Sequence, residues 1–374
     1  MEVVKFGDLF KYQKKSKIKA GDGLELGKGK YPFFTSSNIL SKSIDEFNFS
    51  SPSLIFGTGG KPSVHFCNQK FSVSTDCLVA QPIDEERVCP KYIYYFFSQN
   101  NLRLLEDGFK GAGLKHISRN YIDKIKIPLI PIETQKEIVS ILDNATALRD
   151  KTKKVLDEYN TLAESIFLDM FGDPTKGNLE PIGNSITLSS GYAFKSTDFV
   201  EDGVPLIKIG TVNKGFFDLR NVSFLPINYI KKYKSWIVNP YDLLMSLTGT
   251  VGKNDYGNIE IASNDYDKYL LNQRVVKFNI IKNYNKAFFY HMFLHKAVKR
   301  KVTKLGRGVR QANISTIDIM KLKLIIPPIE LQNEFAEKIA LIEKQKDWAK
   351  QELKESEDLF NCLLQKAFKG ELVS

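Results

Sequence analysis

Two short segments combine basic and glycine residues, the second of them with amides as well, in a pattern suited to contact with nucleic acid. The segment in the second half ends a basic stretch, Lys296 to Ile317, that holds seven Lys or Arg residues and no acid. Lys and Arg neutralise phosphates, whereas Arg, Gln and Asn carry the paired donors and acceptors that recognise base edges. The candidate contacts are Arg307, Arg310, Gln311 and Asn313 in this segment, and Lys110, Lys115 and His116 in its counterpart in the first half.

A solvated helix face would explain the basic residues of Lys296–Lys301 as well as a nucleic-acid partner does, so this part alone is ambiguous. The combination of glycine and basic residues, however, recurs just before each of two Ile-Ser pairs, at Ile117 and Ile314. This recurrence favours a function over a merely solvated surface.

Each half also has a glycine-rich turn that presents a lysine, at Gly57–Lys61 and at Thr248–Lys253. A nucleotide-binding P-loop needs a longer spacing between its glycine and its Gly-Lys pair, and a Ser or Thr after the lysine. Both turns fail on these points, so we interpret them as tight turns. The remaining candidate contacts are Lys61, Lys253, Ser36 and Lys208.

Patterns for catalysis are missing. An adenine methyltransferase needs a glycine-rich cofactor loop and an Asx-Pro-Pro-aromatic motif, but Asn239–Asp242 has a single proline and no such loop upstream. A nuclease needs a carboxylate pair and a lysine that together bind Mg²⁺, and no such set recurs in both halves. The chain has four histidines, two of them in an aromatic segment typical of a core. The sequence therefore predicts a chain without catalytic or metal-binding residues of its own.

Composition supports a folded protein with a polyanionic partner. The 374 residues include 26 Phe and 16 Tyr, are 43% apolar and carry a net charge of +11, which favours nucleic acid over an anionic membrane. No run approaches the roughly 20 apolar residues of a membrane span, and the N-terminus lacks the apolar region of a signal peptide. The four cysteines form no C-x-x-C pair, so we expect reduced thiols and a cytoplasmic location.

The second half of the chain repeats the first. Ile117–Lys126 aligns with Ile314–Lys323, and Pro131–Glu137 with Pro328–Glu334, at one offset of 197 residues. Over the continuous stretch 117–137 there are 10 identities in 21 aligned positions. Such agreement indicates an internal duplication. A duplicated chain folds as two similar units, which suits a two-part target better than one active site.

Three further segments correspond between the halves. Val4–Asp8 resembles Glu180–Asn184, the glycine turns correspond, and an aromatic helix predicted around Tyr92–Phe97 recurs around Ala287–Phe293. The offset drifts here, which suggests variable globular parts on a constant frame.

Each half ends in a long amphipathic helix, predicted from about Glu133 to Met170 and from about Glu330 to Ala367. An apolar strand and a proline precede each helix, and Gly172 or Gly370 follows it. The positions with heptad spacing are Ile138, Leu142, Ala145, Arg149, Thr152, Leu156, Tyr159, Ala163, Ile166 and Met170, and then Phe335, Ile339, Ile342, Lys346, Ala349, Leu353, Ser356, Phe360, Leu363 and Ala367. The pattern favours an antiparallel coiled coil of the two helices. The alternative is that each packs only on its own domain.

The expected fold class is α+β, with two similar globular domains joined by the two long helices and related by a pseudo-two-fold repeat. The globular parts combine aromatic helices with short strands such as Val204–Ile209, expected to alternate in burial. The boundaries we predict are 1–130 for the first domain, 131–173 for its helix, 174–326 for the second domain and 327–374 for its helix.

The order of these parts resembles that of a specificity subunit of a type I restriction-modification system. The runs at 191–199 (GYAFKSTDF) and 203–210 (GVPLIKIG) are similar to the opening of many target recognition domains in this family. The runs at 128–137 and 327–334 resemble the start of its conserved helices. The first domain departs from the pattern, since Tyr31–Ser37 replaces the Val-Pro-Leu-Ile-Lys-Ile-Gly version.

The resemblance implies a non-catalytic, DNA-binding subunit. Each target recognition domain would recognise one half of a split, asymmetric double-stranded DNA sequence, and the paired helices would set the gap. Two methyltransferase subunits would bind this frame and flip an adenine in each half-site, and a restriction subunit could join them. S-adenosylmethionine, ATP and Mg²⁺ would be bound by those partners, with no cofactor in this chain.

Two alternatives remain open from the residues themselves. One is a fused modification-restriction enzyme, against which the missing cofactor motifs argue. The other is a coiled-coil scaffold whose basic loops bind acidic protein, which salt-dependent DNA binding would distinguish from the first interpretation.

Overall fold

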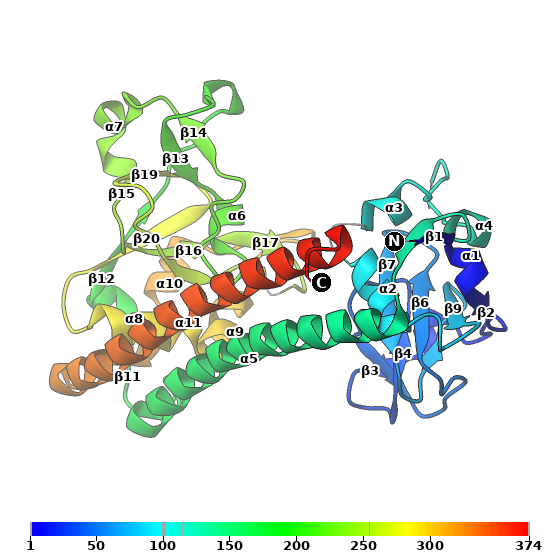
Figure 1. Cartoon of the computed structure of the whole chain (residues 1–374). Helices are drawn as coiled ribbons and strands as arrows, with labels where there is room; N and C mark the ends of the chain where they lie inside the picture. The colour runs from blue at the N-terminus through cyan, green and yellow to red at the C-terminus, as the bar shows by residue number, and fades with distance from the viewer. Residues whose placement is uncertain (1, 99–101, 114, 254, 373–374) are drawn as a thin grey trace. The chain divides into compact units, whose positions relative to one another are not determined.

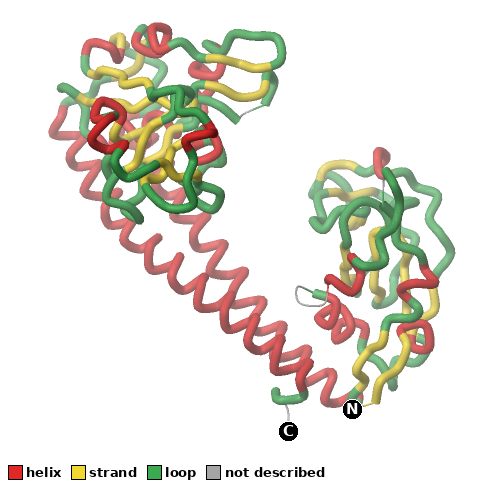
Figure 2. The backbone as a smooth tube through the Cα atoms, turned by 90° about the horizontal axis from the view of Figure 1, so that it is seen from above, coloured by secondary structure: helices red, strands yellow, loops and turns green. Residues whose placement is uncertain are grey.

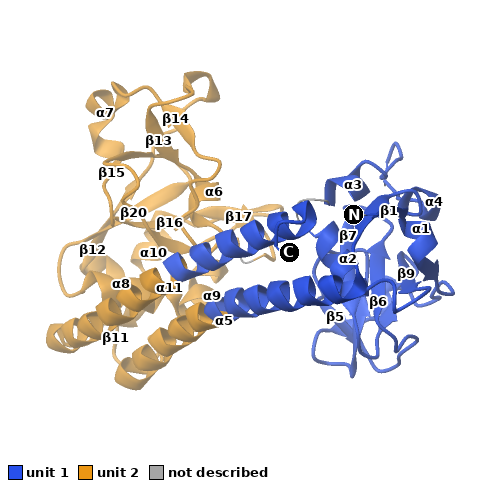
Figure 3. Ribbon diagram, in the orientation of Figure 1, with its two compact units in different colours: residues 1–153, 351–374 blue, residues 154–350 orange. Residues whose placement is uncertain are grey.

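The computed structural model describes residues 2–98, 102–113, 115–253 and 255–372, which form two compact units (Figures 1 and 3). Unit 1 consists of residues 1–153 and 351–374, and unit 2 of residues 154–350. Each unit therefore combines one globular part with a piece of both long helices.

The globular part of unit 1 contains two four-stranded sheets. The first is antiparallel and has the order β2 (Phe10–Tyr12), β9 (Cys77–Pro82), β6 (Ser53–Gly57), β7 (Ser63–Cys67). The second has the order β3 (Leu24–Glu25), β5 (Lys42–Ile44), β4 (Tyr31–Phe34), β8 (Ser72–Val73), and its β4–β8 pair is parallel.

Unit 2 repeats the first sheet and three strands of the second. Its antiparallel sheet has the order β12 (Ile186–Ser190), β20 (Val275–Ile280), β16 (Leu243–Ser246), β18 (Ile259–Ile261). Its second sheet has the order β14 (Ser223–Leu225), β13 (Val204–Ile207), β19 (Tyr269–Leu271), β15 (Ile237–Val238), and here β13–β19 is the parallel pair. The duplication seen in short sequence matches therefore extends to most of the globular part. The fourth strand of the second sheet differs, since β3 pairs with β5 in unit 1 whereas β15 pairs with β19 in unit 2.

Two-stranded ribbons join the ends of each globular part. β1 (Glu2–Lys5) pairs with β10 (Lys126–Leu129) in unit 1, and β11 (Leu179–Pro181) with β22 (Lys323–Ile325) in unit 2. A further ribbon of unit 2 pairs β17 (Thr248–Thr250) with β21 (Gln311–Asn313). The short helices are α1 (Phe6–Leu9), α3 (Leu102–Glu106), α4 (Arg119–Ile122), α6 (Ile209–Val212), α7 (Tyr229–Lys232), α9 (Lys296–Lys304) and α10 (Thr316–Met320).

The two predicted aromatic helices are confirmed as α2 (Pro90–Phe97) and α8 (Lys286–Leu294). Each lies in the main core of its unit, α2 with Tyr92 and Phe97 and α8 with Phe288 and Phe289. The strand predicted at Val204–Ile209 is shorter than expected and does not alternate in burial. Both faces of β13 are covered, because Val204 and Leu206 pack in one core cluster and Ile207 packs in another.

The two long helices are α5 (Ile132–Phe171) and α11 (Ile329–Lys369), close to their predicted limits. Each begins directly after a proline, which lacks the N–H that a first helical turn leaves unpaired. Each ends before a glycine in the left-handed region, Gly172 (φ 66°) or Gly370 (φ 77°), a conformation that glycine adopts without a Cβ clash.

Within each unit α5 and α11 lie side by side and run in opposite directions, so the antiparallel pairing is confirmed (Figures 1 and 2). In unit 1, Leu142 and Ala145 of α5 share a core with Phe360 of α11. In unit 2, the Phe167 ring of α5 lies 5.5 Å from the Phe335 ring of α11. Both helices also pack on the aromatic helices, since Phe167 stacks on Phe288 at 5.5 Å. The pairing and the packing on the domains therefore coexist.

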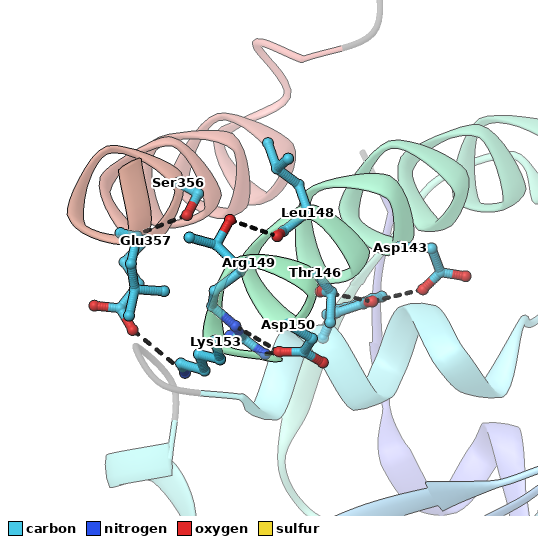
Figure 4. A network of polar contacts seen from close by, with 11 residues as sticks. Asp143, Thr146, Leu148, Arg149, Asp150, Lys153, Ser356 and Glu357 are labelled. Carbon is cyan, nitrogen blue, oxygen red and sulfur yellow. Dashed lines mark hydrogen bonds and ion pairs between the residues drawn. The ribbon is translucent and has the colours of Figure 1, made fainter. Parts of the chain in front are cut away.

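Polar residues in the predicted seam are satisfied locally. In unit 1 the buried hydroxyl of Thr152 donates to the carbonyl of Leu148, one turn back in the same helix (Figure 4). The Arg149 guanidinium lies 5.3 Å from the centre of the Phe360 ring, and Lys153 pairs with Glu357 at 3.4 Å. Such contacts let a polar residue occupy the seam without an unpaired buried group.

One glutamine anchors each long helix to its domain. Gln135 is fully buried, accepts from the N–H of Cys89 at 2.9 Å, and donates to the carbonyls of Arg87 and Ile130. Its counterpart, 197 positions later, makes the same three bonds in unit 2.

That counterpart is Gln332, which accepts from the N–H of Asn285 at 2.8 Å and donates to the carbonyls of Asn283 and Pro327. The repeated Pro-Ile-Glu-x-Gln motif thus joins the first turn of the long helix to the segment before the aromatic helix. Sequence comparison detected the motif but not this role.

All four cysteines are free thiols, with Cys67 and Cys77 buried, as the sequence indicated. Burial raises the pKa of the Cys77 thiol to about 11, so it stays protonated at neutral pH. Among the helices of the described ranges, none combines the length and apolar character that crossing a bilayer requires.

Candidate nucleic-acid interface

The basic segment of unit 1 is called here the first basic loop (110–116), of which the structure describes residues 110–113 and 115–116. Lys110 and His116 each donate a backbone N–H to the carbonyl of the other, both at 3.0 Å. The pair closes the loop, and the side chains of Lys110, Lys115 and His116 are exposed. The sequence candidates of this segment therefore lie together on one solvated loop.

Unit 2 contains the same construction in the second basic loop (307–313). Arg307 and Asn313 exchange two backbone hydrogen bonds of 2.9 Å. Lys110 thus corresponds to Arg307 and His116 to Asn313. Arg307, Arg310, Gln311 and Asn313 are all exposed.

Each basic loop lies against the glycine turn of its own unit. In unit 1 the N–H of Gly60 donates to the carbonyl of Lys115 at 3.0 Å, and the N–H of Ile117 donates to Thr58 at 3.1 Å. In unit 2 the contact is the β17–β21 ribbon, with Thr248 opposite Asn313. The structure therefore brings together, twice, two segments that are about 50 residues apart in the sequence.

The glycine turns are tight turns, as predicted, with an exposed lysine. Gly60 (φ 86°) and Gly252 (φ 79°) occupy the left-handed region just before Lys61 and Lys253. A side chain at either position would be strained, because L residues with a Cβ rarely adopt such angles.

The arginines of the second basic loop differ in their partners. The Arg307 guanidinium forms an ion pair with Asp318 at 2.8 Å, although its side chain is 80% exposed. Within the described ranges the Arg310 side chain has no hydrogen bond or ion pair, and its neighbour Val309 is 93% exposed. Of the two arginines, Arg310 is therefore the one more available to an external partner.

The other two candidates make internal contacts. The Ser36 hydroxyl donates to the carbonyl of Asp76 at 2.8 Å and accepts from the N–H of Gly59 at 3.4 Å, so it supports the glycine turn. Lys208 lies on the second sheet of unit 2, where its ammonium donates to the Ser223 hydroxyl at 2.7 Å. Ser36 thus joins the site of unit 1, whereas no contact of Lys208 with the second basic loop is seen in the described part of the chain.

The lysines of α9 mainly fasten this helix to unit 2. The Lys299 ammonium donates to the carbonyl of Tyr256 and to Asn258, and Lys301 donates to the carbonyl of Thr175 at 3.4 Å. Burial lowers the pKa of Lys299 to about 8. The ambiguity of this basic stretch is therefore resolved in part, since these two ammonium groups have internal partners.

Unit 2 also has a cavity of about 950 Å³ between its β18 edge, α8 and the long helices. Among its lining residues, Glu343 pairs with Lys346 at 2.7 Å. Glu260, 5% exposed, has no ion pair within the described ranges, and burial raises its pKa to about 8. Glu260 is therefore largely protonated at neutral pH.

Sequence reasoning missed one pair of turns that belongs to the same site. The turn 74–77 in unit 1 and the turn 272–275 in unit 2 follow β8 and β19. The first accepts a backbone hydrogen bond from Thr58 of the glycine turn, and the second accepts one from Leu247, the residue directly before the glycine turn of unit 2. Their residues differ completely between the halves, Ser-Thr-Asp-Cys against Asn-Gln-Arg-Val, so no repeat pattern marks them. Only the shared strand pairing identifies them as equivalent.

Comparison with known proteins gives a consistent result. The sequence model of the family described as "Type I restriction modification DNA specificity domain" matches residues 1–159 and 178–357. The chain is 27% identical to the type I restriction enzyme MjaVIII specificity subunit of Methanocaldococcus jannaschii, over 97% of this chain and 92% of that protein. It is 23% identical to the EcoBI specificity subunit of Escherichia coli, over 76% and 66% respectively.

Solved structures agree on the fold. The S subunit of a type I restriction-modification system from M. genitalium superposes with a TM-score of 0.60 at 18% identity, covering 98% of this chain and 96% of that one. A chain from a structure of type I restriction-modification complex assembly gives a TM-score of 0.51 at 13% identity, covering 99% and 98%.

Proposed function

The chain belongs to the type I restriction-modification DNA specificity family, and we propose that each of its two domains recognises one half of a split, asymmetric DNA target. It is a DNA-recognition subunit of such a system and not one of its enzymes, because the family to which both halves belong is a DNA specificity domain. In this proposal the paired long helices set the gap between the half-sites. The domain limits we propose remain 1–130 and 174–326, with helices at 131–173 and 327–374.

The observation that carries the proposal is the duplicated contact between basic loop and glycine turn. Each places exposed lysine or arginine beside exposed polar groups on a backbone held by hydrogen bonds, which is the combination that positions a protein on phosphates and recognises base edges. The two basic loops differ in sequence but lie in the same backbone arrangement, which suits the recognition of two different half-sites. Support for DNA as the partner also comes from the net charge of +11.

The roles proposed for the side chains follow their chemistry. Arg307, Arg310, Gln311, Asn313 and His116 would contact base edges, whereas the lysines would hold phosphates. The proposed phosphate contacts are Lys61, Lys110, Lys115, Lys208 and Lys253. Ser36 would act mainly by supporting its glycine turn.

The partners proposed are double-stranded DNA and two methyltransferase subunits, with a restriction subunit in addition. Those subunits would bind S-adenosylmethionine, ATP and Mg²⁺ and would flip the target adenine out of the duplex. The assembly would work where the chromosome lies, in the cytoplasm of a cell.

Modification-sensitive sequencing of host DNA, with and without this gene, tests the proposal. We expect N6-methyladenine to disappear from one split, asymmetric motif when the gene is deleted, and to return when it is restored. An unchanged methylome in a host that expresses the methyltransferase partner would contradict the proposal and would favour a scaffold role.

A further inference from the structure

The turns 74–77 and 272–275, called here the edge turns, occupy the same place in the two units. In unit 1 the N–H of Ser74 donates to Phe34 at 2.8 Å, and the N–H of Cys77 donates back to Ser74 at 3.2 Å. In unit 2 the N–H of Asn272 donates to Ile207 at 3.0 Å, and the N–H of Val275 donates to Asn272 at 3.0 Å. The backbone of the turn is therefore held identically, whatever its side chains.

A chain of backbone hydrogen bonds joins each edge turn to the start of the glycine turn and then to the residue that directly follows the basic loop. In unit 1 the carbonyl of Asp76 accepts from the N–H of Thr58 at 2.8 Å, and Thr58 accepts from Ile117 at 3.1 Å. The hydroxyls of Ser36 and Thr58 also donate to the Asp76 carbonyl, at 2.8 and 3.0 Å. The main chain at Asp76 is thus held by three hydrogen bonds.

The chain of backbone hydrogen bonds in unit 2 has the same links. The carbonyl of Arg274 accepts from the N–H of Leu247 at 2.9 Å, and Leu247 accepts from Ile314 at 2.8 Å. Asp76 and Arg274 are therefore structurally equivalent, although their charges are opposite. Both side chains are exposed, and neither has an ion pair or side-chain hydrogen bond among the residues the structure describes.

The acidic side chain of Asp76 limits which groups of a nucleic acid this position can contact. The neighbouring loops of unit 1 present Lys61, Lys110 and Lys115, and a carboxylate beside phosphates is repelled unless it accepts a hydrogen bond from a donor of the nucleic acid. In the major groove the exocyclic amino group of cytosine is the donor that Asp commonly contacts, whereas guanine offers two acceptors to Arg. The negative Asp76 thus suits a base that presents a hydrogen-bond donor, and the positive Arg274 suits a base that presents acceptors.

We propose that the edge turn is a third base-contacting segment of each domain, with Asp76 accepting from a cytosine amino group in one half-site and Arg274 donating to guanine in the other. The proposal rests on the proposed function and adds to it a specific base at one position of each half-site. Asp76 and Arg274 were absent from the sequence candidates, because they share neither residue type nor the offset of 197.

The test is the methylated motif produced by the assembled complex with four variants, Arg274→Ala, Arg274→Lys, Asp76→Ala and Asp76→Asn, determined by modification-sensitive sequencing. We expect Arg274→Ala and Arg274→Lys to relax one guanine position in one half-site, where a preference of about tenfold or more falls to near-equal use of the bases. Both Asp76 variants should relax one cytosine position in the other half-site.

Arg274→Lys separates base contact from phosphate contact, because lysine keeps the charge but not the bidentate geometry. If Arg274→Lys leaves the motif intact and Arg274→Ala weakens methylation at all sites equally, Arg274 holds phosphate and the proposal is overturned. Retained specificity at the unaffected half-site is the internal control for folding.

The outcomes also separate this proposal from the function on which it rests. A wild-type complex that methylates no split motif overturns both. A wild-type split motif that stays unchanged at every position in all four variants overturns the edge-turn proposal alone.

Discussion

At the scale of single residues, the candidate contacts differ in what already holds them. Arg307 has the Asp318 carboxylate at 2.8 Å, whereas Arg310 has no partner among the described residues. An arginine that must break or share an ion pair with a carboxylate contributes less free energy to DNA binding than an arginine without such a pair. Arg310 therefore carries the clearest prediction of the second basic loop.

Replacing Arg310 by alanine should weaken specific DNA binding by about 1–3 kcal/mol, the value of one good side-chain contact with a base. The free energy of unfolding should change by less than about 0.5 kcal/mol, because the side chain is exposed. Affinity for the methylated motif in the assembled complex is the measurement. Lys304→Ala, an exposed basic residue outside the loop, is the matched control. Unchanged affinity and motif in Arg310→Ala would show that the arginine makes no contact.

Glu260 should make the stability of unit 2 depend on pH. Its pKa in the folded chain, about 8, lies above the value of an exposed Glu, about 4.3. Between these two values the folded state binds the extra proton, so the free energy of unfolding should fall as pH rises from about 5 to 8. Glu260→Gln should remove this decline and stabilise unit 2 at pH 8 but not at pH 5.

Denaturant unfolding at several pH values measures the effect. Glu343→Gln is the control, since Glu343 lines the same cavity but is already paired with Lys346. Parallel pH curves for the wild type and Glu260→Gln would refute the assignment.

At the scale of elements, the long helices depend on two kinds of contact. Their seam is apolar packing, shared with the aromatic helices α2 and α8, and their first turns are anchored by Gln135 and Gln332. Apolar packing determines how stably each long helix is bound within its unit. The glutamine determines the position at which the helix leaves the globular part. Each kind of contact can be removed separately.

Gln135→Ala should lower the free energy of unfolding of unit 1 by about 2–4 kcal/mol, because one N–H and two carbonyls lose their buried partner. Gln332→Ala should have the same effect on unit 2. Chemical denaturation of each variant is the measurement, with the exposed Lys136→Ala as control. A change below about 0.5 kcal/mol in both glutamine variants would mean that water replaces the lost bonds at no cost.

Helix α5 offers a matched pair of leucines, Leu142 inside the seam and Leu148 outside it. Leu142 is fully buried, whereas Leu148 is 42% exposed. Leu142→Ala should cost about 2–5 kcal/mol through lost burial and the cavity left behind, and Leu148→Ala should cost well under half as much. Equal effects in thermal unfolding would indicate that the α5–α11 pairing is not the one described.

At the scale of the whole molecule, the net charge is +11. Some of the basic residues behind it lie on exposed loops, whose lysines are proposed to hold phosphates. Phosphate contacts release counterions, so the affinity for DNA should fall steeply with salt. With about six such contacts, the binding constant should drop about a thousandfold between 50 and 200 mM salt. Titration of the assembled complex at several salt concentrations measures the slope, and a flat response would favour an acidic protein as the partner of the basic loops.

The repeat predicted much of the architecture from the sequence alone. The duplication, the limits of α5 and α11, their antiparallel pairing, the aromatic helices and the tight glycine turns are confirmed. These features are local or periodic: proline and glycine end a helix through their own backbone preferences, and a heptad pattern marks the buried face of a helix wherever it packs. The corrected case is Val204–Ile209, whose strand β13 is buried because a core cluster covers each of its two faces, which its own pattern does not show.

The sequence by itself determined the family, the duplicated arrangement of domains and long helices, and most of the candidate contacts. Each of these can be recognised from the types of residue and their spacing. Only the tertiary structure decided which of these residues lie together, which are occupied by internal partners such as Asp318, and that Asp76 and Arg274 occupy equivalent places. The physical reason is that backbone hydrogen bonds between distant segments position these side chains. Such bonds use the backbone carbonyl of every residue and the backbone N–H of every residue except proline. The order of the side chains therefore does not reveal them.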